Sequence, residues 1–286
     1  MYLALGRKSE NTATVRAAKG ALTGAYLCCN LGEMQADGSV TSRKNATEVA
    51  DETEAIRAAL ASVTGRADPE VWHVVGVSQQ AIESRSWARS GAPGKFAELA
   101  ASWHSTGLIV DYEPSTNYSQ AHAEAYGRFL EALGEALRNT SAAGAGGGSQ
   151  REMRAGMDFA GWGILDQPFW HAYAAASLGR YTSMSPTYSG ADLLKDEAFA
   201  KSALAGPLPA HAVAFGLGTE LDSKCPPPKW QYHWTEAPLR KFLADIASRG
   251  ALSVDLWRAD IDGYCAEGTA PWMLDAVRDF VSGRLG

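Results

Sequence analysis

Short apolar segments alternate with longer amphipathic segments along most of the chain. The apolar segments are rich in branched residues and mostly uncharged, which is typical of strands buried on both faces of a parallel sheet. They lie at 1–6, 21–29, 71–77, 108–110, 153–159, 180–184, 212–217 and 251–257. Between them, apolar residues at helical spacing predict helices at 47–63, 96–103, 119–138, 167–178, 191–205, 237–249 and 273–281.

This alternation predicts the α/β class, as one (β/α)8 TIM barrel that spans residues 1–286. The weakest of the eight predicted strands is the first, at 1–6, and without it the barrel would be truncated or completed in another way. An open, doubly wound sheet is the alternative. No glycine-rich turn follows the first predicted strand, so nothing indicates a dinucleotide site.

Composition narrows the class of protein. With 46% hydrophobic and 20% charged residues, the 286-residue chain can bury a sizeable core. The formal net charge of −6 argues against nucleic acid as a partner. No apolar run approaches the roughly 18 residues that a membrane span needs, and the first five residues are too few for a secretory signal.

The cysteines and histidines do not form a metal-binding pattern. The six histidines are scattered, with no His-x-x-x-His or Cys-x-x-Cys spacing, so we expect neither a metal nor another cofactor. Cys28 and Cys29 are adjacent in an apolar run, and we expect them to be buried thiols. Cys225 and Cys265 each follow a predicted strand, and whether they pair stays open.

The segment that carries the clearest chemistry runs from Gly107 to Pro114. Its apolar centre leads directly into Asp111, Tyr112 and Glu113. Because side chains alternate along a strand, Asp111 and Glu113 point the same way, about 7 Å apart. Proximity of like charges and partial burial raise the pKa of one carboxyl, which can then act as a general acid near neutral pH. A strand that simply reaches the surface is the alternative.

Other polar and aromatic residues also follow predicted strands, where the active site of such a barrel lies. Aromatic rings beside carboxylates suit a sugar-binding cleft, because rings stack on the apolar faces of pyranoses while acids bind hydroxyls. Taken singly, each tryptophan is better explained by packing, except Trp257, which ends a buried strand. We expect the substrate-binding residues to include Gln79, Tyr112, Asp158, Trp162, Glu220 and Trp257.

The order of these segments resembles that of the family 18 glycoside hydrolases, the chitinase-like barrels. Their fourth strand carries D-G-x-D-x-D-x-E, and the matching segment here is T-G-L-I-V-D-Y-E, from Thr106 to Glu113. Gly107, Asp111 and Glu113 match, whereas Thr106 and Ile109 replace two acids. Met184 with Tyr188 resembles the sixth-strand Met-x-Tyr, and 253–262 resembles the last strand with its Trp.

The resemblance implies a role for each matching residue. Glu113 would protonate the glycosidic oxygen, and Asp111 would orient the substrate's own 2-acetamido group, which attacks the anomeric carbon. Tyr188 would bind the acetamido oxygen, and Trp257 would support the sugar. Because Ile109 replaces the acid that normally sits beside Asp111, we expect another acid, Asp158 from the next strand, to tune Asp111.

The leading hypothesis is therefore a retaining glycosidase that acts on N-acetylhexosamine-containing glycans. The resemblance implies an oligosaccharide or polysaccharide partner, a monomer, an extracellular or secretory-pathway location, and neither nucleic acid nor membrane as partner. A non-catalytic, lectin-type chitinase-like barrel is the second hypothesis, since two motif acids are absent. A barrel hydrolase of another class, such as a phosphodiesterase, is the third, although few basic residues follow the strands.

Overall fold

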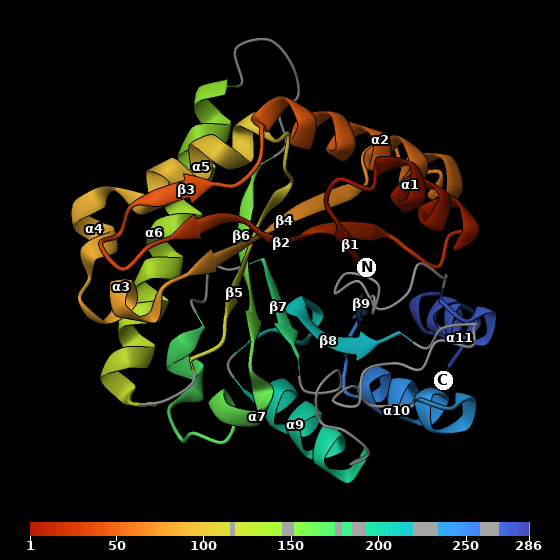
Figure 1. Ribbon diagram of the computed structural model, residues 1–286. Coiled ribbons are helices and arrows are strands. Elements are labelled where there is room, and N and C mark those ends of the chain that lie inside the picture. Colours follow the sequence, from red (N-terminus) through yellow and green to blue (C-terminus); the bar gives the residue numbers. More distant parts are fainter. Residues whose placement is uncertain are drawn as a thin grey trace.

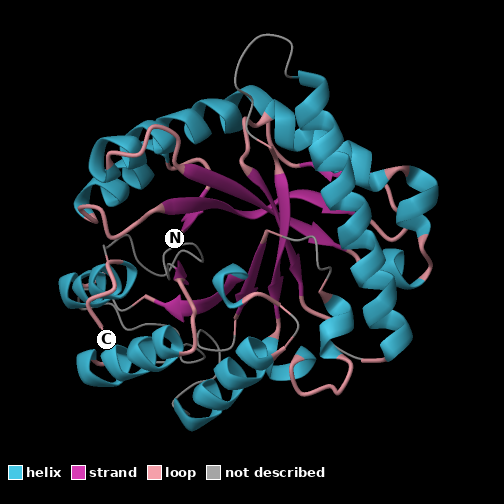
Figure 2. Cartoon of the chain, turned by 180° about the vertical axis from the view of Figure 1, so that it is seen from behind, coloured by secondary structure: helices cyan, strands magenta, loops and turns pink. Residues whose placement is uncertain are grey.

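The computed structural model describes residues 1–114, 118–144, 152–174, 179–184, 193–206, 208–219, 234–257 and 269–285. Within these residues, eight parallel strands form one sheet in the order β1-β2-β4-β5-β6-β7-β8-β9, and the short strand β3 pairs antiparallel with β2. The helices surround this sheet, which curves round into a nearly closed (β/α)8 barrel (Figures 1 and 2). The predicted fold class is confirmed.

The eight strands of the barrel lie close to the apolar segments of the sequence. Their bounds are β1 Tyr2–Ala4, β2 Gly24–Met34, β4 Glu70–Val77, β5 Gly107–Tyr112, β6 Arg154–Phe159, β7 Arg180–Ser183, β8 Val213–Gly218 and β9 Ser253–Trp257. The first strand is therefore present, and it pairs in parallel with β2, Tyr2 beside Tyr26. In the described residues β1 and β9 form no ladder, but the rings of Tyr2 and Trp257 lie 4.9 Å apart.

The helices pack their apolar faces against the outside of the barrel, where most of the core lies. Helix α2 begins after Asn45, whose side chain accepts a hydrogen bond from the Thr47 backbone N–H at 2.8 Å, and ends at left-handed Gly65. The longer helices are α1 Lys8–Ala17, α2 Ala46–Thr64, α5 Ala92–Ser102, α6 Gln120–Gly144, α9 Leu193–Ala205, α10 Glu236–Ser248 and α11 Pro271–Val281.

Two segments differ from the sequence-based expectation. The helix expected at 167–178 is absent where the structure describes it: a single turn, α7 Gly161–Ile164, is followed by the 3-10 helix η1 Trp170–Tyr173. Pro168 interrupts the helical pattern here, because it lacks an N–H donor. In addition, strand β2 continues to Met34 and forms a hairpin with β3 Val40–Ser42.

The adjacent cysteines also differ from expectation. Cys28 and Cys29 are bonded to each other in a disulfide, so they are not free thiols. Cys28 is buried in the barrel interior, while Cys29 is exposed. The regular pairing of β2 with β4 is interrupted between Leu27 and Gly32, and the two cysteines lie within this interruption. Cys225 and Cys265 lie outside the described residues.

Candidate active site

Strand β5 divides its side chains between the barrel interior and the surrounding helices. Ile109 belongs to the interior cluster, together with Tyr2, Tyr26, Cys28, Trp72 and Val74. Tyr112 lies on the opposite face, where its ring stacks on Tyr126 of α6 at 4.3 Å between centroids. Because side chains alternate, Asp111 shares the inward face of Ile109 at the carboxyl end of the strand.

Asp111 and Glu113 interact electrostatically, as their spacing predicts. Burial raises the pKa of Asp111 to about 7, and the nearby Glu113 carboxylate contributes in the same direction. Glu113 is exposed as a residue, yet partial desolvation of its carboxyl raises its pKa as well. A carboxyl group with a raised pKa can still carry a proton near neutral pH, as a general acid must.

Asp158 extends this acidic site onto the neighbouring strand. It is the direct register partner of Asp111 in the parallel pair of β5 and β6, and it is only 2% exposed. The hydroxyl of Tyr2 donates a hydrogen bond to its Oδ1 at 2.6 Å. Burial raises the pKa of Asp158 well above its usual range, and the charge of Asp111 adds to this effect.

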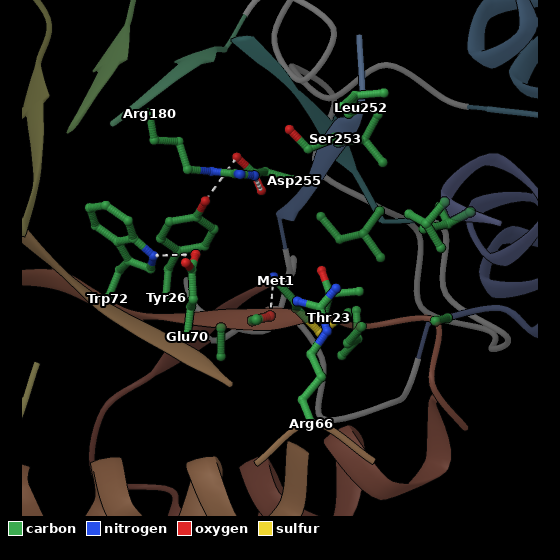
Figure 3. A pocket seen from close by; sticks show the side chains of 18 residues that line it. Met1, Thr23, Tyr26, Arg66, Glu70, Trp72, Arg180, Leu252, Ser253 and Asp255 are labelled. Carbon is green, nitrogen blue, oxygen red and sulfur yellow. Dashed lines mark hydrogen bonds and ion pairs between the residues drawn. The ribbon is translucent and has the colours of Figure 1, made fainter. Parts of the chain in front are cut away.

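A second buried carboxylate, Asp255 of β9, lies in the same interior. Arg180 donates to its Oδ1 at 2.5 Å, while Thr182 and Tyr26 donate to its Oδ2 at 2.7 and 3.3 Å. Figure 3 shows Arg180 and Tyr26 converging on Asp255. Sequence reasoning missed this network and Tyr2. The available signal was the period of two in β9, which puts Asp255 on the same face as Trp257.

The cavity in Figure 3 lies at the opposite end of the barrel from Asp111 and Glu113. Its volume is about 80 Å³, and it is lined at the amino ends of the strands by residues such as Glu70, Trp72 and Ser253. None of the predicted site residues lines it. It is therefore separate from the candidate active site.

Thr106 and Ile109, which replace the two motif acids, have structural roles. The hydroxyl of Thr106 accepts a hydrogen bond from the backbone N–H of Val71 at 3.0 Å. Ile109 is fully buried, and its Cδ1 would lie 2.6 Å from a Cβ built on Gly156 of β6. A glycine at position 156 therefore makes room for the isoleucine inside the barrel.

The remaining predicted residues are only partly brought together. Trp257 is half-buried beside Tyr2, and its Nε1 is buried without a partner among the described residues. Tyr112 faces away from the interior, where its hydroxyl bonds His122 Nε2 at 2.5 Å. Gln79 begins α3 (Gln79–Glu83) just after β4, and its Nε2 donates to Glu83. Tyr188, Glu220 and the Trp162 side chain lie outside the described part.

The described residues contain no group of three or more His, Cys, Asp or Glu side chains that could hold a metal ion. None of the described helices combines the length and the apolar character that crossing a bilayer demands.

Comparison with known proteins identifies the fold. No family model matches the chain, and no curated protein matches it in sequence. Among solved structures, it shares its fold with the chitinase-like barrels. A mutant family 18 chitinase from Cycas revoluta, in complex with (GlcNAc)4, is 12% identical with a TM-score of 0.66, and the match covers 100% of this chain and 98% of that one.

Two further structures give the same result. A class V chitinase from Nicotiana tobaccum is 11% identical, with a TM-score of 0.64 and coverage of 100% and 97%. A chitinase-like agglutinin from Robinia pseudoacacia is 13% identical, with a TM-score of 0.63 and coverage of 100% and 98%. At these identities the likeness establishes the fold alone, and it includes both enzymes and an agglutinin.

Proposed function

We propose that the protein is a retaining glycosidase that cleaves N-acetylhexosamine-containing glycans with assistance from the substrate's acetamido group. The observation that carries the proposal is the pair Asp111 and Glu113 at the carboxyl end of β5, both with raised carboxyl pKa values. Glu113 is the more accessible of the two, which suits a group that must reach a glycosidic oxygen. It is the general acid in this proposal.

Asp111 has a different role because it lies deeper in the barrel. Its Oδ1 is buried and has no hydrogen-bond partner among the described residues, so it is available to an N–H of the substrate. An ionised Asp111 would orient the acetamido group and stabilise the positive charge that develops when its oxygen attacks the anomeric carbon. Trp257 supports the sugar, and Tyr188 binds the acetamido oxygen.

The nature of the ligand follows from similar proteins. The barrels of the same fold include the Cycas revoluta chitinase, crystallised with (GlcNAc)3 and, as a mutant, with (GlcNAc)4. We therefore infer a chitin-type oligosaccharide as substrate, a monomeric protein and an extracellular or secretory-pathway location. Light scattering tests the monomer, and fractionation of the source cells tests the location.

A lectin-type function is the second candidate, since an agglutinin has the same fold. The absence of acids at Thr106 and Ile109 favours it. Retention of Glu113 favours the enzyme, because a barrel that only binds sugar has no need of a general acid.

The deciding experiment measures hydrolysis of a fluorogenic chitotriose glycoside by the wild type, Glu113→Gln and the matched control Glu98→Gln. Glu98 is an exposed glutamate on α5, remote in sequence from the β5 end. Removal of a general acid lowers kcat/KM by roughly 10²- to 10⁴-fold, so we expect a loss of this size in Glu113→Gln and none in Glu98→Gln.

Each other result has a defined meaning. Full activity of Glu113→Gln would remove Glu113 from the role of acid. No cleavage by any of the three proteins, with chitotetraose binding detected by calorimetry, would establish the lectin-type function. If the protein neither cleaves the substrate nor binds chitotetraose, its likeness to the chitinases is limited to the fold.

A further inference from the structure

Tyr112 ends strand β5 between the two acidic residues of the candidate site, and its side chain is held from outside the barrel. It is only 2% exposed, and its ring stacks on Tyr126 of α6 at 4.3 Å between centroids. Its hydroxyl lies 2.5 Å from Nε2 of His122, in the first turn of the same helix. Ser119 fixes that turn, because its Oγ accepts a hydrogen bond from the His122 backbone N–H at 3.2 Å.

His122 joins Tyr112 to an acid on a third element. Helices α3 and α6 contact each other on the outside of the barrel (Figure 1). The imidazole is buried, and its Nδ1 faces Oε1 of Glu83 at 3.4 Å, an ion-pair distance without hydrogen-bond geometry. Glu83 ends α3, and Gln79 Nε2 donates to the same oxygen at 2.9 Å. Glu83, His122 and Tyr112 therefore form a continuous series of side chains from α3 to the carboxyl end of β5.

The positions of the protons in this series follow from its surroundings. Burial raises the pKa of Tyr112, so the phenol keeps its proton and donates to Nε2 of His122. Burial also lowers the pKa of His122, and the Glu83 carboxylate opposes this only in part. A neutral imidazole that accepts at Nε2 carries its proton on Nδ1, which faces Glu83. Near neutral pH the Tyr112 hydroxyl therefore has its acceptor.

Glu113 depends on its neighbours for its position, because it lies beyond the strand ladder. The register of β5 with β6 ends at Tyr112, opposite Phe159. After Glu113, the carbonyl of Pro114 accepts a hydrogen bond from the Tyr118 hydroxyl at 2.8 Å. A tyrosine hydroxyl thus holds the chain on each side of Glu113. Only the one on the β5 side donates to a group that titrates.

We propose that His122, through Tyr112, positions Glu113 for acid catalysis, and that protonation of the imidazole releases this hold. The inference rests on the proposed glycosidase function and adds two positioning residues to it. A protonated imidazole has a hydrogen on each nitrogen, so Nε2 can no longer accept the bond from Tyr112. The hydroxyl loses its acceptor, while the attraction between the imidazolium and the Glu83 carboxylate grows. The end of β5 is then less constrained where the general acid leaves the strand.

The groups that face the imidazole decide the pH of this release. Among the described residues they are Tyr112 from β5, Glu83 from α3 and Tyr173 from η1, whose ring lies 6.0 Å away. Glu83 favours the charged imidazole, whereas burial favours the neutral one and has the larger effect on the pKa. The release therefore occurs below pH 6.5, the ordinary pKa of histidine.

The first test is an NMR titration of the full chain without substrate, with labelled histidine ring nitrogens and glutamate side-chain carboxyls. His122→Gln and Glu113→Gln assign the two resonances. In the wild type we expect the Glu113 carboxyl to inflect at the pH where His122 titrates, in addition to its own titration. In His122→Gln, whose amide oxygen can accept from Tyr112 but binds no proton, that inflection should disappear.

Single substitutions should move the His122 titration in opposite directions. Tyr112→Phe removes the donor that stabilises the neutral imidazole, so His122 should titrate at higher pH. Glu83→Gln removes the charge that stabilises the imidazolium, so His122 should titrate at lower pH. Tyr173→Phe is the matched control. It removes a buried neighbouring hydroxyl that has no hydrogen-bond partner among the described residues, so it should leave the titration in place.

The second test follows hydrolysis of a fluorogenic chitotriose glycoside. Near neutral pH we expect Tyr112→Phe to lower kcat roughly 3- to 10-fold, as the loss of one hydrogen bond predicts, with little change in KM because Tyr112 faces the helices. Tyr173→Phe should stay within about 2-fold. At acid pH, where His122 is protonated, the difference between the wild type and Tyr112→Phe should shrink, because the wild type has already lost the same bond.

A Glu113 resonance that ignores the His122 titration, or one that keeps the inflection in His122→Gln, would overturn the coupling whether or not the protein is active. Equal effects of Tyr112→Phe and Tyr173→Phe on kcat, or a Tyr112→Phe effect that does not change with pH, would overturn the positioning role. A coupled titration in a protein that cleaves no glycan would sustain the link between His122 and Glu113 while refuting the glycosidase function, so the two failures are distinguishable.

Discussion

Asp158 and Asp255 are buried carboxyl groups inside the same barrel, yet their surroundings differ. Asp255 accepts hydrogen bonds from Arg180, Thr182 and Tyr26, one of which comes from a permanent cation. Asp158 accepts a hydrogen bond from Tyr2 and interacts with the Thr182 hydroxyl, and its register partner is another carboxyl group, Asp111. Asp255 is paired with a permanent cation as part of the scaffold, whereas burial and the neighbouring Asp111 raise the pKa of Asp158, which is driven to hold a proton.

The largest expected effect comes from breaking the Asp255 site. Arg180→Leu removes the cation and leaves a buried carboxylate unpaired, which should destabilise the protein by about 3–5 kcal/mol in urea unfolding. The double variant Arg180→Leu with Asp255→Leu removes both charges and should recover most of that loss. A change below about 1 kcal/mol in the single variant would contradict the described pairing.

The second-largest effect concerns how the free energy of unfolding depends on pH. The pKa of Asp111 is 3.8 in an ordinary environment and about 7 in the folded protein, so the folded state binds its proton more tightly. Its contribution to the free energy of unfolding is therefore fully present below pH 4 and is lost as pH rises through 7, by on the order of 4 kcal/mol.

Asp111→Asn cannot titrate, so it should lack that decline. The measurement is urea unfolding of the wild type and Asp111→Asn at a series of pH values from 4 to 8, and the quantity compared is the difference between the two proteins. If the difference does not change with pH, the burial of Asp111 described here is incorrect.

A smaller effect should come from the packing that sets β5 against β6. A Cβ at Gly156 would lie 2.6 Å from Ile109 Cδ1 and 2.7 Å from the Arg180 carbonyl oxygen. Gly156→Ala must therefore shift a side chain and a backbone, and we expect a loss of about 1–3 kcal/mol. Gly134→Ala on α6, where the nearest atom is 3.5 Å away, is the control and should be neutral or slightly stabilising. Equal effects would mean that the interior tolerates extra volume.

Much of the fold could be predicted from the sequence because it depends on local patterns. Buried parallel strands are continuous apolar runs, and the helices between them have a regular apolar face, so both repeat visibly along the chain. The expectation failed where one residue decides the geometry. Pro168 breaks the pattern of a predicted helix, and the bond between Cys28 and Cys29 depends on the chemistry of two sulfurs.

The candidate site could be predicted only in part. Asp111 and Glu113 were visible because they lie two residues apart at the end of one strand, where the spacing of two predicts a common direction. Tyr2 was not, because its contact with Asp158 joins strands on opposite sides of the barrel. No pattern in one sequence reports such a contact. Tyr112 was expected near the substrate, but its place between two inward-facing acids sends its ring towards α6.

The contact between the rings of Tyr2 and Trp257 joins the first strand of the sheet to the last. The ribosome makes β1 first and β9 last, so the Trp257 indole that packs against the Tyr2 ring is absent during most of synthesis. Local elements such as α2 and the β2–β3 hairpin can form earlier, because their contacts are close in sequence. The Tyr2 hydroxyl is therefore fixed in position only after the last strand has been translated. The site can form only when the barrel is complete.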